Sequence, residues 1–233
     1  MGFWKLDRVP EPEEMDEAEE VQSYNSAAAA RHLDAIDNTF VKHLRRLLPT
    51  RETWNGSCWG LDVGTGPAQI PIKILRQIPG LKIIGLERSP SMLACARQNA
   101  AQAGLADRLL LLRADGHSLP FPDGVFSMVC CNSVLHHARE PLRLLREIFP
   151  VAAPDAAVLL RDLRRPARPL LRWHLWRHGR HYQGLMRRLF ENSARAAYTL
   201  EELEDFIQKA GLPGATVFRF RGAHIGIERP AGR

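Results

Sequence analysis

The stretch that decides the fold is Leu61-Asp62-Val63-Gly64-Thr65-Gly66-Pro67-Ala68-Gln69. It contains the end of an apolar, β-prone run over residues 58–63 and leads into a helical pattern over residues 67–77. Glycines at positions 64 and 66 let the chain turn sharply and let a ligand approach the backbone. The helix that follows offers free N–H groups. A strand, a glycine turn and a helix in this order predict a ligand-binding turn of an α/β fold.

The same alternation continues on both sides of this turn. Further strand-like runs lie at 81–86, 108–113, 125–131 and 156–161, and helical stretches lie at 90–103 and 139–149. Alternating strands and helices predict βαβ units and a mostly parallel sheet. Upstream, residues 26–48 have the apolar spacing of one helix that ends at Pro49.

Another helix and a hairpin are expected near the C-terminus. Thr199-Leu-Glu-Glu202 has the form of a capping box, and Gly211 fits the end of the helix that it starts. Two short strand-like runs, 215–220 and 223–228, predict an antiparallel hairpin about Gly222.

Two acidic residues follow neighbouring strands of the predicted sheet. Glu87 ends the second strand, 21 residues after Gly66, where an acid accepts hydrogen bonds from ribose hydroxyls. Asp115, with Gly116, follows the third strand, where a carboxylate can accept a hydrogen bond from the exocyclic amine of adenine. Met92 can contact the adenine ring. The glycine motif lacks the last glycine of the dinucleotide fingerprint, which argues against NAD(P).

With these motifs in order, the run 61–161 resembles a class I S-adenosylmethionine-dependent methyltransferase of the small-molecule type. GLERSPSML resembles its ribose motif, and RADGHSLPFPDGVFSMVCCNSVLHH resembles its adenine loop and fourth strand. The resemblance implies a Rossmann-like α/β fold with seven strands in the order 3-2-1-4-5-7-6, strand 7 antiparallel. It implies S-adenosyl-L-methionine as cofactor and S-adenosyl-L-homocysteine as product. The cofactor-binding residues that we expect are Tyr24, Asp62, Gly64, Thr65, Gly66, Glu87, Arg88, Met92, Asp115, Gly116 and Asn132.

Two positions depart from the family pattern. Ala68 replaces the third motif glycine, and Pro154-Asp155-Ala156 replaces the usual Pro-Gly-Gly before strand five. Pro150 also interrupts the end of the preceding helix. The second change puts the turn in doubt but leaves the cofactor site intact.

The catalytic candidates follow strand four, in Asn132-Ser133-Val134-Leu135-His136-His137. This motif lacks the Asn/Asp-Pro-Pro-aromatic form that is used on base amines, which argues against an adenine or glutamine N-methyltransferase. His136 or His137 can act as a general base, because an unperturbed imidazole titrates near pH 6.5. A purely structural role for both histidines stays open.

Charge is segregated along the chain, which carries a formal charge of +6. Residues 11–20 hold seven acids, and residues 161–188 hold nine arginines against one acid. We expect 1–22 to be a flexible acidic arm and 23–233 to be a single domain with a lid-like insert at 163–198. The substrate-lid candidates are Arg164, Arg165, Trp173, Trp176 and Tyr182.

The insert has several interpretations. It can be a lid helix that buries its tryptophans and leaves its arginines solvated, or it can meet an acidic substrate, an anionic membrane surface or nucleic acid. The functions considered are therefore methyl transfer to a small, lipophilic or acidic acceptor, an RNA or protein methyltransferase, and a non-catalytic cofactor-binding module. The intact cofactor motifs weigh against the last.

Composition bounds these functions further. No apolar run is long enough for a transmembrane segment, and the acidic N-terminus does not look like a signal peptide, so we expect a cytoplasmic protein. The four cysteines lack the spacing of metal-binding motifs, and His174, His178 and His181 have no carboxylate or cysteine near them in the sequence to complete a metal site. No metal is therefore predicted. The oligomeric state is not predicted.

Overall fold

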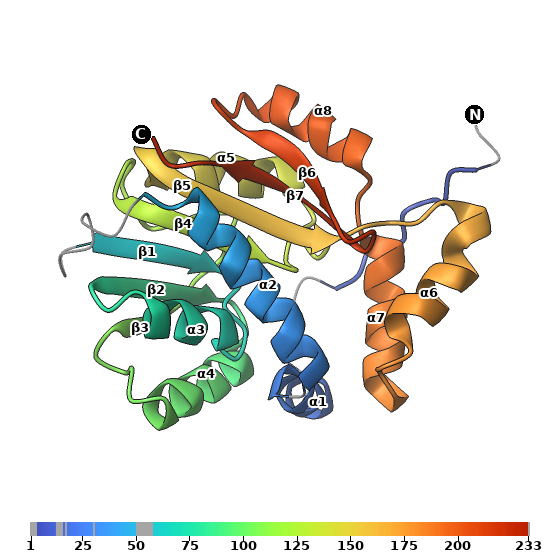
Figure 1. Cartoon of the computed structure of the whole chain (residues 1–233), viewed down its shortest axis with the longest axis horizontal. Helices are drawn as coiled ribbons and strands as arrows, with labels where there is room; N and C mark the ends of the chain where they lie inside the picture. Colours follow the sequence, from blue (N-terminus) through green and yellow to red (C-terminus); the bar gives the residue numbers. More distant parts are fainter. Residues whose placement is uncertain (1–3, 13–15, 17, 30, 50–57, 233) are drawn as a thin grey trace.

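A seven-stranded sheet forms the centre of the molecule (Figure 1). The computed structural model describes residues 4–12, 16, 18–29, 31–49 and 58–232. The strand order is β3-β2-β1-β4-β5-β7-β6, with β7 antiparallel to both of its neighbours and the other pairs parallel. This is the order that the resemblance implied, and the prediction is confirmed. The strands are β1(Cys58–Val63), β2(Leu81–Glu87), β3(Leu109–Arg113), β4(Phe126–Asn132), β5(Ala152–Leu163), β6(Thr216–Phe220) and β7(His224–Arg229).

Helices cover both faces of the sheet. One face packs against α2(Arg31–Leu47), α3(Gln69–Gln77) and α4(Pro90–Gln102), and the other against α5(Pro141–Val151) and α8(Leu200–Ala210). Adjacent residues of a strand therefore enter different apolar clusters, as Met128 and Val129 of β4 do. This burial on both faces explains why the strands are continuous apolar runs without polar alternation.

The C-terminal predictions are confirmed in detail. Thr199 and Glu202 form the capping box of α8, and Gly211 ends that helix in the left-handed conformation at φ 65°. β6 and β7 pair as the expected hairpin around Gly222. Near strand five, α5 continues through Pro150 to Val151, and β5 begins directly after it at Ala152.

The N-terminal region differs from the single helix expected over 26–48. There are two helices, α1(Ala18–Ala29) and α2, and α1 begins inside the range expected to be an acidic arm. The helical spacing of apolar residues in this part of the sequence belongs to α2, whose Phe40, Leu44 and Leu47 are buried against the sheet. The described residues before α1 pack against the rest of the chain. For example, the Val9 amide donates a hydrogen bond to the Arg195 carbonyl of α7 at 3.2 Å.

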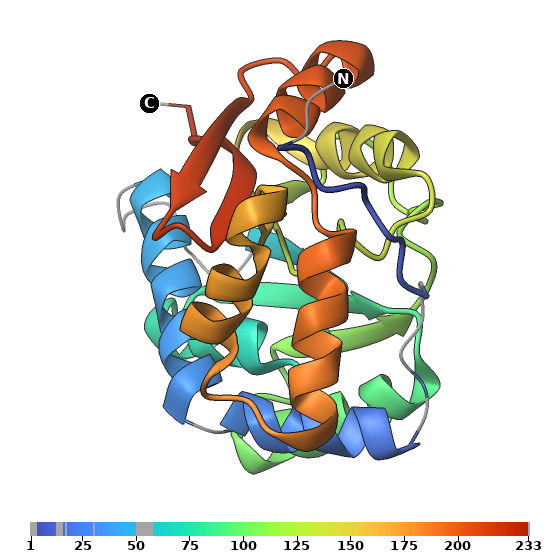
Figure 2. The same cartoon turned by 90° about the vertical axis from the view of Figure 1, so that its right-hand side faces the viewer.

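The basic insert forms a layer of its own beyond the carboxyl end of the sheet. It contains a 3-10 turn, η2(Arg168–Leu170), then α6(Leu171–Gly179) and α7(Gly184–Ala196). Figure 2 shows α6 and α7 lying side by side, and the two helices are in contact. Within the described part of the chain, no helix combines the length and apolar character needed to cross a bilayer.

Candidate active site

A groove of about 150 Å³ opens at the carboxyl ends of β1, β2 and β4. Such strand ends are where open α/β sheets bind ligands. Nine of the predicted cofactor residues line the groove, and Asp62 and Thr65 line a smaller adjoining cavity. The nine are Tyr24, Gly64, Gly66, Glu87, Arg88, Met92, Asp115, Gly116 and Asn132.

Glu87 is held at the end of β2 by backbone amides. Its Oε2 accepts from the Gly66 amide at 2.9 Å, and its Oε1 accepts from the amides of Arg88 and Ser89 at 2.8 and 3.0 Å. A carboxylate offers about four lone-pair sites, so Oε2 keeps a site for a ligand hydroxyl. The glycine turn therefore fixes the acid that faces the groove.

Asp115 lies in the same groove, beyond β3. Its Oδ1 accepts from the backbone amide and from the ring Nδ1 of His117, both at 2.9 Å. Partial burial would raise the pKa of Asp115, but these two hydrogen bonds, together with the charges of His117 and Arg88, outweigh burial and lower the pKa. The second carboxylate is therefore ionised at neutral pH, and it converges with Glu87 on one groove as predicted.

The glycine turn keeps the groove open. Gly66 has φ 51°, and a Cβ atom built on it would meet no atom within 4 Å, so its missing side chain leaves space for a ligand. Gly64 has φ 72°, and its Cβ would lie 2.3 Å from Val134 Cγ2. Close approach of the 134 loop thus requires glycine at position 64. An acid with a free acceptor site beside open space fits a nucleoside cofactor.

Asp62 is buried under this turn. Thr65 Oγ1 donates to its Oδ2 at 2.7 Å, and Cys130 Sγ donates to its Oδ1 at 3.2 Å. Burial raises the pKa of Asp62 to about 6, although both hydrogen bonds act in the opposite direction. The carboxylate shapes the turn from beneath, and it reaches the smaller cavity rather than the groove.

A second and larger cavity, of about 390 Å³, adjoins the groove. We call it the acceptor cavity. The two spaces share four lining residues, which are Tyr24, Asn132, Ser133 and His137. Its apolar wall comes from α2, β5, α7 and β6: Leu33, Ile36, Leu163, Met186, Leu189, Phe190 and Phe220.

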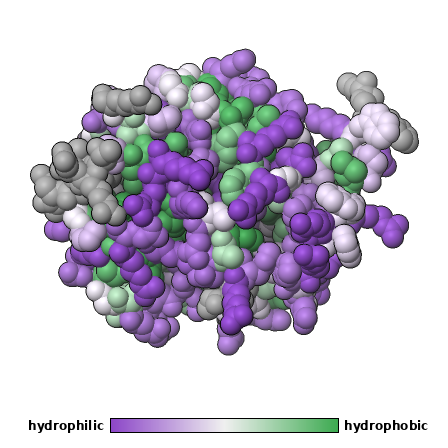
Figure 3. All heavy atoms as spheres, in the orientation of Figure 1, coloured by the Kyte–Doolittle hydropathy of each residue, from purple (hydrophilic) through white to green (hydrophobic). Residues whose placement is uncertain are grey.

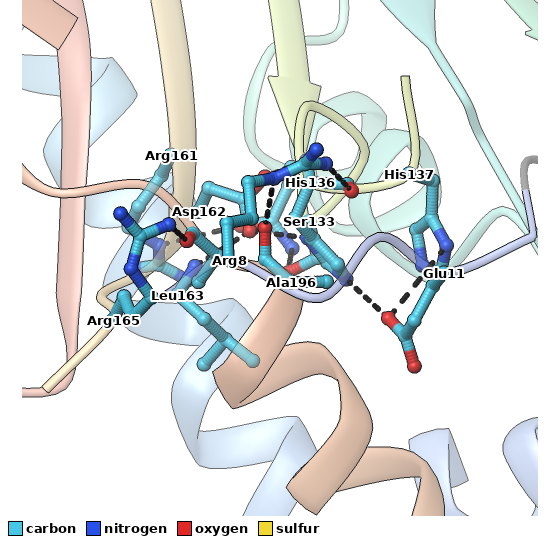
Figure 4. Close-up of polar contacts among 12 residues, drawn as sticks. Arg8, Glu11, Ser133, His136, His137, Arg161, Asp162, Leu163, Arg165 and Ala196 are labelled. Carbon is cyan, nitrogen blue, oxygen red and sulfur yellow. Dashed lines mark hydrogen bonds and ion pairs between the residues drawn. The ribbon is translucent and has the colours of Figure 1, made fainter. Parts of the chain in front are cut away.

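His136 lies at the wall of the acceptor cavity and is almost fully buried. Figure 4 shows its ring between two carboxylates. Asp162 Oδ1 lies 2.5 Å from Nδ1, and Glu11 Oε2 lies 3.6 Å from Nε2. Burial would lower the pKa of His136, but Asp162 and Glu11 outweigh it and raise the pKa above 6.5. Nε2 has no hydrogen-bond partner among the described residues.

His137 differs from its neighbour although the rings lie 4.1 Å apart. Its Nδ1 lies 3.0 Å from the Pro12 carbonyl, and it faces both cavities. Burial, and then the nearby His136, lower the pKa of His137 to about 4, so it is neutral at pH 7. Ligand atoms of Glu11, His136 and His137 lie within 4.8 Å of one another, a grouping that the sequence did not predict and that could hold a metal ion.

The junction of the two cavities is built on a strained residue. Ser133 has φ 58°, which is uncommon outside glycine and costs about 1 kcal/mol or more. Its amide donates to the Arg161 carbonyl at 2.8 Å. The buried Arg161 guanidinium donates to Asn132 Oδ1 at 3.3 Å and to Thr39 Oγ1 at 2.9 Å. Arg161 thereby ties the end of β4 to α2.

Four of the five predicted lid residues lie outside the acceptor cavity, and only Tyr182 lines it. Arg165 is buried, and its guanidinium donates a hydrogen bond to Glu202 Oε1 of α8 at 2.6 Å. Arg164 donates to the Gly222 carbonyl at 3.0 Å. Trp173 and Trp176 are 55% and 57% exposed. The interpretation that the lid helix buries its tryptophans is therefore wrong, because His174 and Leu175 occupy its buried side.

Several site residues were missed by sequence reasoning. Asp162 is the penultimate residue of β5, and Glu87 is the last residue of β2, so the strand-end rule could have found Asp162 as well. Asp37 of α2 lines the acceptor cavity, and burial raises its pKa to about 7 against the opposing effect of Lys73 and Arg161. No local pattern could have found Asp37, or Glu11 in the acidic segment.

Comparison with known proteins agrees with this site. Residues 61–160 match the family model described as "Methyltransferase domain". A demethylmenaquinone methyltransferase of Lactiplantibacillus plantarum is 29% identical over 192 residues, which are 75% of this chain and 79% of that protein. A demethylmenaquinone methyltransferase of Thermus thermophilus is 32% identical over 106 residues, 46% of this chain and 47% of that protein.

Solved structures show the same fold. A SAM-dependent methyltransferase from Aquifex aeolicus is 17% identical with a TM-score of 0.64, and the match covers 92% of this chain and 98% of that one. The plantazolicin methyltransferase BpumL, solved with a desmethyl substrate analogue and S-adenosylhomocysteine, is 13% identical with a TM-score of 0.68, covering 93% and 92%. Together with the groove and its motifs, these matches identify a methyltransferase domain at residues 61–160 and show that the chain has the fold of S-adenosylmethionine-dependent methyltransferases.

Proposed function

We propose that this enzyme methylates a small, lipophilic ring compound that carries an ionisable hydroxyl, such as a quinol. The observation that carries the proposal is the acceptor cavity: its walls are apolar, it meets the cofactor groove, and a buried His136–Asp162 pair stands at its wall. Apolar pockets with a few convergent polar groups are typical of small-molecule sites. The relatives named as demethylmenaquinone methyltransferases support a ring acceptor of this kind.

The cofactor would be held along the groove by the residues already described. Glu87 would accept from the ribose hydroxyls, Asp115 from the adenine amine, and Met92 would contact the ring. The glycine turn and Asn132 would surround the methionine part. When bound, S-adenosylmethionine would supply a methyl group on a sulfonium, and attack of the acceptor on that methyl carbon would break the carbon–sulfur bond and release the neutral thioether.

His136 would act as the general base. Its Nε2 would accept the proton of the acceptor hydroxyl, and the negative charge left on the acceptor would make the acceptor a stronger nucleophile toward the methyl group. Asp162 on Nδ1 fixes the tautomer and stabilises the imidazolium that forms, and Glu11 adds a second negative charge 3.6 Å from Nε2. General-base catalysis contributes roughly 10²- to 10⁴-fold to a rate. Asn132, tethered by Arg161, and the strained Ser133 hold the passage between the two cavities.

A labelled-cofactor assay tests this function. The purified protein is incubated anaerobically with methyl-labelled S-adenosylmethionine and one of three acceptor sets: 1,4-naphthalenediol and its alkylated derivatives, total RNA, or denatured protein extract. We expect label only in the diol fraction. Label in RNA or protein alone would contradict the proposal. Failure to bind S-adenosylhomocysteine at millimolar concentration, by calorimetry on folded protein, would contradict it at an earlier step.

A further inference from the structure

The outer side of the basic insert carries an unusual mixture of side chains. We define the lid face as Arg168, Leu170, Arg172, Trp173, Trp176, Arg177 and Arg180, which are all exposed. On α6, positions 172, 173, 176 and 177 recur at helical spacing and so share one side of the helix, and Arg180 follows directly after its last residue. In Figure 3 the edge formed by α6 shows apolar and strongly hydrophilic side chains next to one another.

The apolar members of the lid face are too exposed to serve the fold. Leu170 is 50% exposed, and Trp173 and Trp176 are more so. Trp4 extends this face, because it is 65% exposed and its carbonyl accepts from the Arg168 amide at 2.9 Å. Three tryptophans and a leucine thus gather at one end of the molecule. Bulky exposed apolar groups that cluster mark an interaction surface.

The charge of this surface has one sign. Residues 163–190 contain no aspartate or glutamate. Among the described residues, Arg168, Arg172, Arg177 and Arg180 form no ion pair with a carboxylate, whereas Arg187 on α7 pairs with Glu191. Four arginines without acidic partners among the described residues give this surface a positive potential, which attracts an anionic partner.

The lid face is also joined firmly to the acceptor cavity. The opposite side of α6 packs on α7: the His174 and Phe190 rings stack with centroids 6.5 Å apart, and a Cβ on Gly179 would lie 2.9 Å from Phe190. Phe190, Met186 and Leu189 of α7 line the cavity, and α6 itself contributes Arg177 and His178 to its lining. Because Arg177 belongs to the lid face and also lines the acceptor cavity, a partner bound at the lid face lies next to that cavity.

We propose that the lid face docks on an anionic lipid bilayer. Tryptophan prefers the headgroup level of a membrane, arginines bind anionic headgroups, and leucine adds apolar area that enters the acyl boundary. Leu170 favours lipid over RNA, since an aliphatic side chain has no ring on which a base can stack. Docking at this face would let a lipid-dissolved acceptor enter the cavity. Only that last consequence rests on the proposed function; membrane binding itself does not.

Vesicle flotation of the full chain tests the proposal without cofactor or acceptor. We expect binding to vesicles of 30% phosphatidylglycerol in phosphatidylcholine and little binding to phosphatidylcholine alone. Each arginine near an anionic surface contributes roughly a fivefold gain in partitioning. Arg168→Glu/Arg172→Glu should therefore lower binding by at least about 25-fold. The matched control, Arg76→Glu/Arg97→Glu on α3 and α4, changes the same charge at exposed sites remote from the lid face and should bind like the wild type.

A second variant separates insertion from simple charge attraction. Trp173→Ser/Trp176→Ser keeps every arginine, so it should lose most of the binding and of the blue shift in tryptophan fluorescence on vesicles. Equal binding by this variant and the wild type would overturn the proposal, as would absence of wild-type binding at 50 mM salt. Tighter binding of single-stranded RNA than of anionic vesicles, lost in the same variants, would assign the face to nucleic acid instead. Because no methyl transfer is measured, failure here leaves the proposed acceptor untouched.

Discussion

The cofactor groove and the acceptor cavity lie side by side but are built differently. The groove is made where β1, β2 and β4 end, and its key groups follow each strand within a few residues. The acceptor cavity takes its lining from α1, α2, the end of β4, α6, α7 and the turn between β6 and β7. The carboxyl ends of parallel strands lie at the same edge of the sheet because of the sheet topology alone. The acceptor cavity, by contrast, forms only when the inserted helices pack over that edge.

This difference separates what the two regions do. A groove built on strand ends depends on the sheet topology and on few contacts between distant segments, which suits a constant cofactor. A cavity closed by an insert can change with the insert, which suits a variable acceptor. Variants in one region should therefore change one ligand and spare the other.

The largest effect is expected at the wall of the acceptor cavity. His136→Gln should lower kcat by roughly 10²- to 10⁴-fold and leave S-adenosylhomocysteine affinity unchanged, because the base is lost while the groove is intact. Steady-state kinetics and calorimetry measure the two effects. His43→Gln is the matched control, since His43 also pairs with a carboxylate, Glu228, at 2.6 Å but outside both cavities. Normal turnover in His136→Gln would remove the general base from the account.

The next effect belongs to the groove. Glu87→Gln should weaken S-adenosylhomocysteine binding by roughly 10- to 100-fold, because hydrogen bonds to a charged group contribute about 1.5–3 kcal/mol. Acceptor KM at saturating cofactor should stay the same. Glu147→Gln is the control, since Glu147 accepts from the Leu119 amide at 2.8 Å away from the groove. If both variants lose affinity equally, the effect is one of folding, and the ribose assignment fails.

The pH profile distinguishes a catalytic His136 from a structural one. Activity requires the neutral imidazole, so it should fall as pH drops through the raised pKa of His136. Asp162→Asn removes the charge that raises this pKa, and burial then lowers it. The acid limb of the kcat/KM profile should therefore move to lower pH, and the plateau value of kcat/KM should fall by about tenfold or more. An acid limb at the same pH in both proteins would show that another group titrates.

The smallest effect is expected from the apolar wall. Met186→Ala removes contact area from the acceptor cavity, worth about 1 kcal/mol or a little more, so acceptor KM should rise roughly five- to tenfold. Cofactor affinity should not change, because Met186 does not line the groove. A change confined to cofactor affinity would show that the two regions are not separate sites.

Sequence reasoning succeeded where neighbours along the chain are neighbours in space. The glycine turn, Glu87 and Asp115 could be placed because each follows a strand whose position the alternating pattern predicts. It failed where contacts join distant segments. Glu11 reaches His136 from 125 residues away, and the sequence around it indicated only an acidic arm. The tryptophans were misassigned because helical spacing shows which residues share a side of α6 but not which side packs on α7.

The central claim is that one enzyme holds a nucleoside cofactor and a lipophilic acceptor in two adjoining spaces. A crystal structure with S-adenosylhomocysteine and 1,4-naphthoquinone as an inert acceptor analogue tests it most directly. The account predicts the nucleoside between Glu87 and Asp115, and the ring in the acceptor cavity with an oxygen within hydrogen-bond reach of His136. A ring bound elsewhere while that cavity stays filled by the protein's own side chains would contradict it.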